Sequence, residues 1–171
     1  LRDGTLDGKA QAALVLFEVS RNDNVQEVKI VEAGGIEVII MLLRHGTPEA
    51  KTQAAATLIR STDSAINPVN IAEAGGNKPL FTLLQNGTPQ GKAYAAIALL
   101  FIHRDDNDQL VKIVEAGGIE AIIALLRDGA PEDKLKAIIG LFLAAKNTDN
   151  RVKIAEAGGV EALTALLRDG T

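Results

Sequence analysis

The sequence of 171 residues has no cysteine and no tryptophan, and it contains only one tyrosine, four phenylalanines and one methionine. The absence of cysteine excludes disulfide frameworks, thiolate nucleophiles and cysteine-ligated zinc, and it favours an intracellular, cytoplasmic location. Hydrophobic residues make up 47% of the chain but aromatic residues only 3%. The core must therefore be built from Ala, Val, Ile and Leu, which suits helices packed against helices.

Excess positive charge and long apolar runs are also missing. The lysines and arginines number 18 against 22 acidic residues, which gives a net charge of −4. Such a chain has no basic field that would attract nucleic acid or anionic lipid. The longest apolar runs, 95–102 and 137–145, have about half of the roughly 20 residues that a membrane span needs. The sequence therefore predicts neither a nucleic-acid partner nor a membrane partner.

What the sequence does have is an internal repeat. The tetrapeptide Glu-Ala-Gly-Gly begins at Glu32, Glu73, Glu115 and Glu156, at intervals of 41, 42 and 41 residues. Each copy is followed by a second helix-forming stretch that ends in a leucine pair and a glycine turn. A fixed period in this range is typical of stacked helical repeats and not of a globular enzyme domain.

Turn-forming residues divide one period into three helices. The first helix is predicted over 25–33 and is ended by Gly34, because a helix exit usually needs the backbone freedom of glycine. The second is predicted over 36–45. Thr47-Pro48 is an N-cap followed by a proline in the first helical turn, so a third helix should run over 48–61. The pattern predicts an all-α chain with about 12 helices.

This three-helix unit resembles the armadillo repeat. The resemblance rests on the Glu-Ala-Gly-Gly turn, the Ile/Val-Glu-x-x-x-x-Leu-Leu second helix, and the Lys-x-x-Ala-Ala pattern that opens the third helix at Lys9 and Lys51. It covers essentially the whole chain. It implies a right-handed superhelical α-solenoid whose third helices line a concave groove, and such a groove usually holds an extended peptide or a partner protein.

We expect a single armadillo-type domain over 1–171 that starts with a third helix, residues 6–20, and ends after a second helix. Two interpretations of the ends stay open. The sequence is either a segment of a longer array, or its copies associate head to tail or by exchange of a terminal helix. The expected periods are approximately 1–42, 43–83, 84–125 and 126–171. The candidate end-to-end contacts are Leu16, Phe17, Val160, Leu163 and Leu167.

The resemblance also supplies candidate groove residues. Peptide-binding armadillo proteins often carry an asparagine on the third helix and a tryptophan one turn before it, and this sequence has neither residue at the matching positions. The familiar ladder of side-chain amides is therefore not expected. The apolar residues at these positions form either a hydrophobic groove or part of the core, and the sequence leaves both open. The positions are Leu14, Glu18, Ala56, Arg60, Ile97, Phe101, Ile139 and Leu143.

Residues for catalysis or metal binding are few. The two histidines, His45 and His103, fall near the ends of different helices, where the helix dipole alone favours them. The acidic run 105–108 lacks the glycine and glutamate that close a calcium loop, and capping of the next helix explains it better. We predict no catalytic residue, metal or cofactor. The sequence indicates a protein-interaction or scaffold module and not an enzyme, with a self-assembling structural unit, natural or designed, as the alternative.

Overall fold

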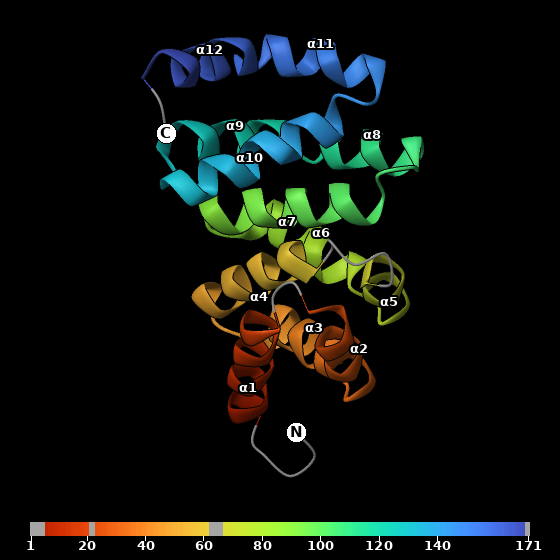
Figure 1. The fold of residues 1–171 in the computed structure, drawn as a ribbon. Helices are drawn as coiled ribbons and strands as arrows, with labels where there is room; N and C mark the ends of the chain where they lie inside the picture. Colours follow the sequence, from red (N-terminus) through yellow and green to blue (C-terminus); the bar gives the residue numbers. More distant parts are fainter. Residues whose placement is uncertain (1–5, 21–22, 62–66, 170–171) are drawn as a thin grey trace.

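The computed structural model describes residues 6–20, 23–61 and 67–169, and within these ranges it contains twelve α-helices and no strand. The prediction of an all-α chain with about 12 helices is confirmed. Figure 1 shows the helices stacked in layers, from α1 at one end to α11 and α12 at the other. The helices are α1 (Leu6–Val19), α2 (Asn24–Glu32), α3 (Gly35–His45), α4 (Pro48–Ser61), α5 (Asn67–Glu73), α6 (Asn77–Asn86), α7 (Pro89–Ile102), α8 (Asn107–Glu115), α9 (Gly118–Asp128), α10 (Pro131–Ala144), α11 (Thr148–Glu156) and α12 (Gly159–Asp169).

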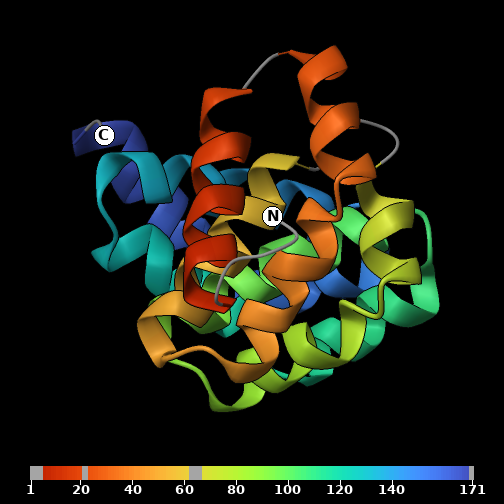
Figure 2. The same cartoon turned by 90° about the horizontal axis from the view of Figure 1, so that it is seen from below.

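The helices follow one another in groups of three. The predicted helices over 25–33, 36–45 and 48–61 correspond to α2, α3 and α4, and the same order recurs in α5 to α7 and in α8 to α10. The helices in third place contact one another in a row, α4 against α7 and α7 against α10. Figure 2 looks along the stack from the α1 end, with α1 and α2 nearest the viewer. We call α1, α4, α7 and α10 the third helices.

The two glycines of each Glu-Ala-Gly-Gly turn are needed for different reasons. Gly34 has a φ of 81°, in the left-handed region that glycine adopts without steric cost. Gly35 has ordinary dihedrals, but a Cβ placed there would lie 2.6 Å from Cγ2 of Ile30 on the preceding helix. The tetrapeptide is therefore a tight turn between two helices in contact. The other three copies repeat both features, with positive φ at Gly75, Gly117 and Gly158 and a close isoleucine beside Gly76, Gly118 and Gly159.

Short polar side chains begin several helices by accepting hydrogen bonds from free backbone N–H groups. Asp23 Oδ1 accepts from the amides of Val25 and Gln26, each at 3.1 Å. Asp106 Oδ1 accepts from the Gln109 amide at 3.1 Å and so caps α8. Such caps satisfy donors that the helix itself leaves unpaired. The interpretation of the acidic run 105–108 as a helix cap is confirmed at Asp106.

Recurring contacts join one repeat to the next. Nη2 of Arg44, near the end of α3, donates to the carbonyl oxygen of Gly75 at 3.3 Å. Nη2 of Arg127, near the end of α9, donates to the carbonyl oxygen of Gly158 at the same distance. In both cases the arginine of one second helix bonds the turn of the following repeat. The stack is therefore held by directed contacts as well as by apolar packing.

The third helices differ greatly in burial. On α7, every residue from Ala93 to Leu100 is buried, because the helix contacts α4, α6, α9 and α10. On α1, by contrast, Ala13 and Phe17 are buried while Val15 and Val19 are exposed. Among the described helices, none is long and apolar enough to cross a membrane.

Candidate binding surface of the third helices

A groove of about 320 Å³ lies between α1 and α4. It brings together three of the residues predicted from the sequence, Leu14 and Glu18 on α1 and Ala56 on α4. Ala56 is 8% exposed and contributes only a methyl group to the lining. Its complete lining is Gln11, Leu14, Val15, Glu18, Gln53, Ala56 and Thr57.

Two glutamines of this groove, Gln11 and Gln53, were missed at the sequence level. They occupy equivalent positions, two residues after the lysine that opens each helix, as the pairs Lys9-Ala-Gln11 and Lys51-Thr-Gln53 show. Each amide offers both donors and an acceptor. The recurrence of Lys-x-Gln was the available signal. It was overlooked because the asparagine of the resembling family lies elsewhere on the helix.

The structure corrects the interpretation of Ile97 as a groove residue. Ile97 is 0% exposed and packs against α10, where a Cβ added to Gly140 would lie 2.8 Å from its Cγ1. Glycine at this position lets the two helices approach closely enough to enclose the isoleucine. Ile97 therefore belongs to the core.

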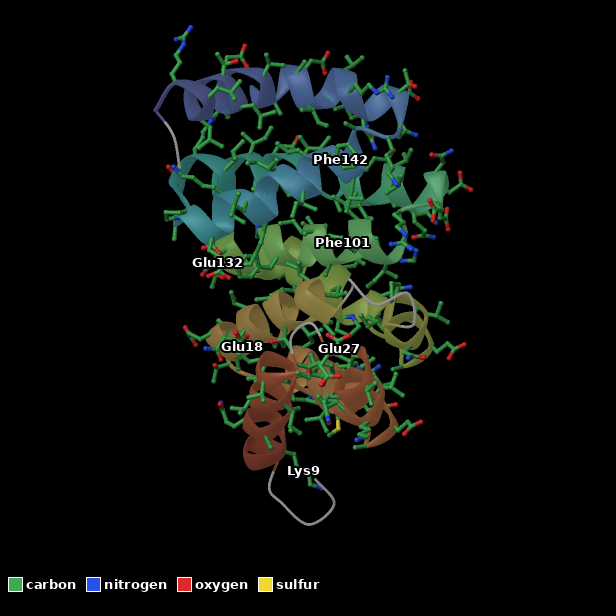
Figure 3. All side chains as sticks on the ribbon, in the orientation of Figure 1. Lys9, Glu18, Glu27, Phe101, Glu132 and Phe142 are labelled. Atoms are coloured by element: carbon green, nitrogen blue, oxygen red, sulfur yellow. The ribbon has the colours of Figure 1, made fainter. Side chains whose placement is uncertain are left out.

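The remaining candidates on the third helices divide between core and surface. Leu143 is also buried and is corrected in the same way, while Phe101 is half-buried against the core. Ile139 remains 46% exposed on α10. The side chain of Arg60 lies outside the described residues. Figure 3 shows Phe101 on α7 and Glu18 on α1. In the described part of the second half, these candidates do not form a continuous apolar groove, because Ile97 and Leu143 are buried between helices.

A polar cluster occupies the junction between α7 and α10, where the first half has its groove. The Tyr94 hydroxyl donates to Oδ1 of Asp133, and Nε2 of Gln90 donates to the other carboxylate oxygen of Asp133 at 3.0 Å. Nζ of Lys136 also donates to Oδ1 of Asp133, at 3.1 Å, and lies 5.3 Å from the centre of the Tyr94 ring. Three donors thus satisfy one buried carboxylate, which is the condition for keeping a charge out of water.

The cluster shifts the pKa values of its members in opposite directions. Burial, followed by the hydrogen bond to Asp133 and its negative charge, raises the pKa of Tyr94. Burial alone would raise the pKa of Asp133 too, but the hydrogen bonds from Tyr94 and Lys136 and the Lys136 charge outweigh it and lower that pKa. At neutral pH the cluster therefore contains a neutral phenol bonded to a carboxylate. Its partners are internal to the chain, and two of its members, Gln90 and Asp133, also line a hollow at the edge of the junction.

A second kind of hollow recurs at the edge of the stack. One of about 420 Å³ lies beside Pro89, Leu125 and Gly129, where a second helix ends and a third helix begins. Another of about 320 Å³ lies one repeat earlier, beside Pro48, Leu83 and Gly87. Because a hollow lies at the same position in both repeats, we attribute it to the geometry of the turn between the second and third helices.

The histidines take structural positions. Nε2 of His103 lies 3.1 Å from Oδ1 of Asn77, and burial lowers the pKa of His103, with a smaller contribution from the Lys112 charge. His45 is the exposed last residue of α3. In the part of the chain that the structure describes, no three His, Asp or Glu side chains are grouped so that they could hold a metal ion.

The two ends of the stack present apolar side chains, with one correction. Phe17 is buried at 3% exposure, since its ring packs beside Gly35 of α3, so it is not available for an end-to-end contact. Leu16, Val160 and Leu167 are exposed, and Leu163 is half-buried. These four remain candidates for contact with another molecule.

No protein-family model and no curated protein matches the chain. Solved structures do. An engineered protein is 31% identical to this chain, with a TM-score of 0.69; the match spans 99% of this chain and 70% of the engineered protein. A designed armadillo repeat protein is 26% identical, with a TM-score of 0.70; the match spans 99% of this chain and 72% of the designed protein. Another designed armadillo repeat protein, in complex with the peptide (KR)4, has 25% identity, a TM-score of 0.65 and coverage of 98% and 76%.

The stacked groups of three helices and the row of third helices define an α-helical solenoid. The designed proteins that match it over nearly its whole length carry the same repeat. The chain therefore has the fold of the armadillo repeat solenoids, which it resembles over nearly its whole length.

Proposed function

We propose that the chain is a protein-interaction module that holds an extended peptide, or an extended segment of a partner protein, against its third helices. The observation that supports this most strongly is the groove between α1 and α4, which combines amide, aliphatic and carboxylate side chains from two neighbouring repeats. Nothing in its lining suggests a reacting group, so the module acts by binding and not by catalysis.

Each part of the groove suits one part of an extended ligand. The amides of Gln11 and Gln53 can donate to and accept from the backbone of a peptide that lies across both helices. Leu14 and Ala56 leave room for an apolar side chain of that peptide. Glu18, exposed at the same groove, favours a cationic residue beside it.

The matching structures support a peptide as the ligand. One designed armadillo repeat protein of this fold was solved with (KR)4, a peptide of alternating lysine and arginine. The present groove has one acidic side chain and three aliphatic ones, so we expect it to prefer a peptide with a single basic residue next to an apolar residue.

The test is selection of peptides from a displayed library on the immobilised protein, with (KR)4 as a reference ligand, followed by affinity measurement by fluorescence polarisation. Gln53→Ala should weaken the selected peptides by about three- to tenfold, which corresponds to one or two neutral hydrogen bonds at about 0.5–1.5 kcal/mol each. Gln11→Ala together with Gln53→Ala should weaken them further.

The matched control is Gln85→Ala, which removes an exposed glutamine from α6, outside the groove. It should leave the affinity unchanged. If Gln85→Ala weakens binding as much as Gln53→Ala, or if neither glutamine of the groove affects affinity, the peptide binds elsewhere and the proposed site is wrong.

A further inference from the structure

The third helix α10 carries an exposed apolar stripe. Leu135, Ile139 and Phe142 follow at intervals of four and three residues, so they share one face of the helix. Ile139 is 46% exposed and Phe142 is 68% exposed, and Leu135 is exposed as well. Figure 3 shows Phe142 on α10. Three large apolar side chains in a row on one helix are a contiguous patch and not a scatter of single residues.

The same face is covered on the preceding third helix. The lysine that opens each third helix sets the register, and Lys92 on α7 corresponds to Lys134 on α10. In this register the stripe corresponds to Ala93, Ile97 and Leu100, all of which are buried. On α7 this face is covered by α10, as the contact of Ile97 with Gly140 shows. The stripe is therefore the face with which one third helix receives the next.

Helix α1 shows the opposite half of the same interface. Lys9 corresponds to Lys134, so positions on the two helices can be compared directly. The buried residues of α10, through which it packs on its own repeat and on the preceding one, are Asp133, Ala137, Gly140, Leu141, Leu143 and Ala144. The corresponding residues of α1 are all exposed, namely Gly8, Ala12, Val15, Leu16, Glu18 and Val19.

The second helix next to the stripe is uncovered in the same way. Val160 and Leu167 on α12 are exposed, whereas the corresponding Ile119 and Leu126 on α9 are buried at 1% and 2% exposure. A hollow of about 320 Å³ also lies between α9 and α12, with Lys134 of α10 in its lining. The surface formed by α10 and α12 therefore presents the positions that are covered at the equivalent places on α7 and α9.

We propose that this surface binds α1 of a second copy of the chain, so that copies associate head to tail. The interface continues the α7–α10 contact, because each of its two sides is a face that the third helices already use inside one molecule. The contact is heterologous, since one face is on α10 and α12 and the other on α1. It generates an open chain of copies, or a ring if the rotation closes.

Charge favours the parallel direction that successive third helices have within the stack. With the two helices parallel, Glu18 near the end of α1 approaches the exposed Lys146 that follows α10, and Lys9 approaches Glu132 at the start of α10. The reverse direction would place Glu18 beside Glu132 and Lys9 beside Lys146. Like charges at such short range oppose association. Val15 occupies the position of Gly140, so the helices meet at a greater separation and the contact is weaker than the one between α7 and α10.

The proposal is tested by sedimentation velocity of the whole chain over a wide range of concentrations. The mean mass should rise with concentration. Phe142→Glu removes one face and Val19→Glu removes the other, and because both side chains are exposed, at 68% and 78%, each variant should fold as judged by circular dichroism. Each variant alone should be monomeric.

Mixing the two variants is the decisive step. The Val19→Glu chain keeps its α10 face and the Phe142→Glu chain keeps its α1 face, so an equal mixture should form a one-to-one dimer that cannot extend. The control is Val69→Glu on α5, 57% exposed and outside both faces, which should associate like the original chain. Val15 and Glu18 belong both to this face and to the α1–α4 groove, but the association is measured without peptide, and Gln11 and Gln53, which test the groove, lie outside the face.

Three results would overturn the proposal. The first is a monomer at every concentration. The second is continued self-association of the Val19→Glu chain, which would mean that the α10 face pairs with itself. The third is loss of association in Val69→Glu, which would identify the association as non-specific.

Discussion

The junction of α1 with α4 and the junction of α7 with α10 are built from equivalent positions but differ in form. At the first, Gln11 and Gln53 border an open groove. At the second, the equivalent residues are Tyr94 and Lys136, and both are bound to Asp133. One period of sequence therefore produces either an open groove or a closed contact. The outcome depends on a few side chains and not on the repeat itself.

Two physical differences account for this. At the closed junction a glycine faces an isoleucine, Gly140 against Ile97, and the helices come close together. At the open junction the equivalent residues are Thr57 and Leu14, so no glycine is present there, and Figure 1 shows α1 inclined to α4 more steeply than α4, α7 and α10 are to one another. Close packing buries Ile97 at the α7–α10 junction, whereas the α1–α4 junction keeps the groove that we propose as the binding site.

The largest effect that would test this comparison comes from truncating the same register position in the two settings. Ile97→Ala should lower the free energy of unfolding by about 2–5 kcal/mol, because it leaves a cavity in a fully packed site. Ile139→Ala, at the equivalent but 46% exposed position on α10, should cost less than about 1 kcal/mol. Urea unfolding followed by circular dichroism at low protein concentration measures both. Equal costs would show that α7 is not the packed centre of the stack.

A smaller effect is expected from filling the glycine of the closed junction. Gly140→Val should destabilise the chain by about 1–3 kcal/mol, because its Cβ would lie 2.8 Å from Ile97 and 3.2 Å from Ile122. Val15→Leu enlarges the equivalent, exposed position of α1 and should change stability by less than about 0.5 kcal/mol. Thermal unfolding of the two variants side by side measures the difference. A Gly140→Val chain as stable as the original would mean that the two helices separate without cost.

The smallest effect concerns the polar cluster. Tyr94→Phe removes one donor from the buried Asp133 carboxylate and should cost about 1–2 kcal/mol at neutral pH. Gln11→Ala at the equivalent, exposed position of the open junction should cost less than about 0.5 kcal/mol. Chemical unfolding at pH 7 compares them, and a cost at Gln11 equal to that at Tyr94 would contradict the distinction between the junctions.

The cluster also predicts a dependence on pH. The pKa of Asp133 is lower in the folded chain than its ordinary value, so its stabilising contribution is complete above that ordinary value, about 4. The contribution is lost as the pH falls through the folded pKa, because the unfolded chain takes up the proton first. Tyr94→Phe should reduce this acid-dependent loss, which unfolding measured between neutral and acidic pH will show.

Part of the candidate site could be read from the sequence. The register of the third helices named Leu14, Glu18 and Ala56, and these three residues line the hollow between α1 and α4. It failed at Ile97 and Leu143, because an apolar residue on a solenoid helix packs against a neighbour or faces a ligand with the same sequence signature. It also failed at Phe17, whose burial depends on the space beside Gly35 of another helix.

The sequence by itself determined the period, the order of the helices and their ends. These follow from local physics, since glycine at positive φ, N-cap side chains and apolar periodicity act within a few residues of the chain. The tertiary structure alone decided which junction is open and which side of α1 and α10 meets water. Those outcomes depend on how side chains from helices about forty residues apart fit together, as Ile97 and Gly140 do. Packing of that kind is a property of pairs, and no single repeat encodes it.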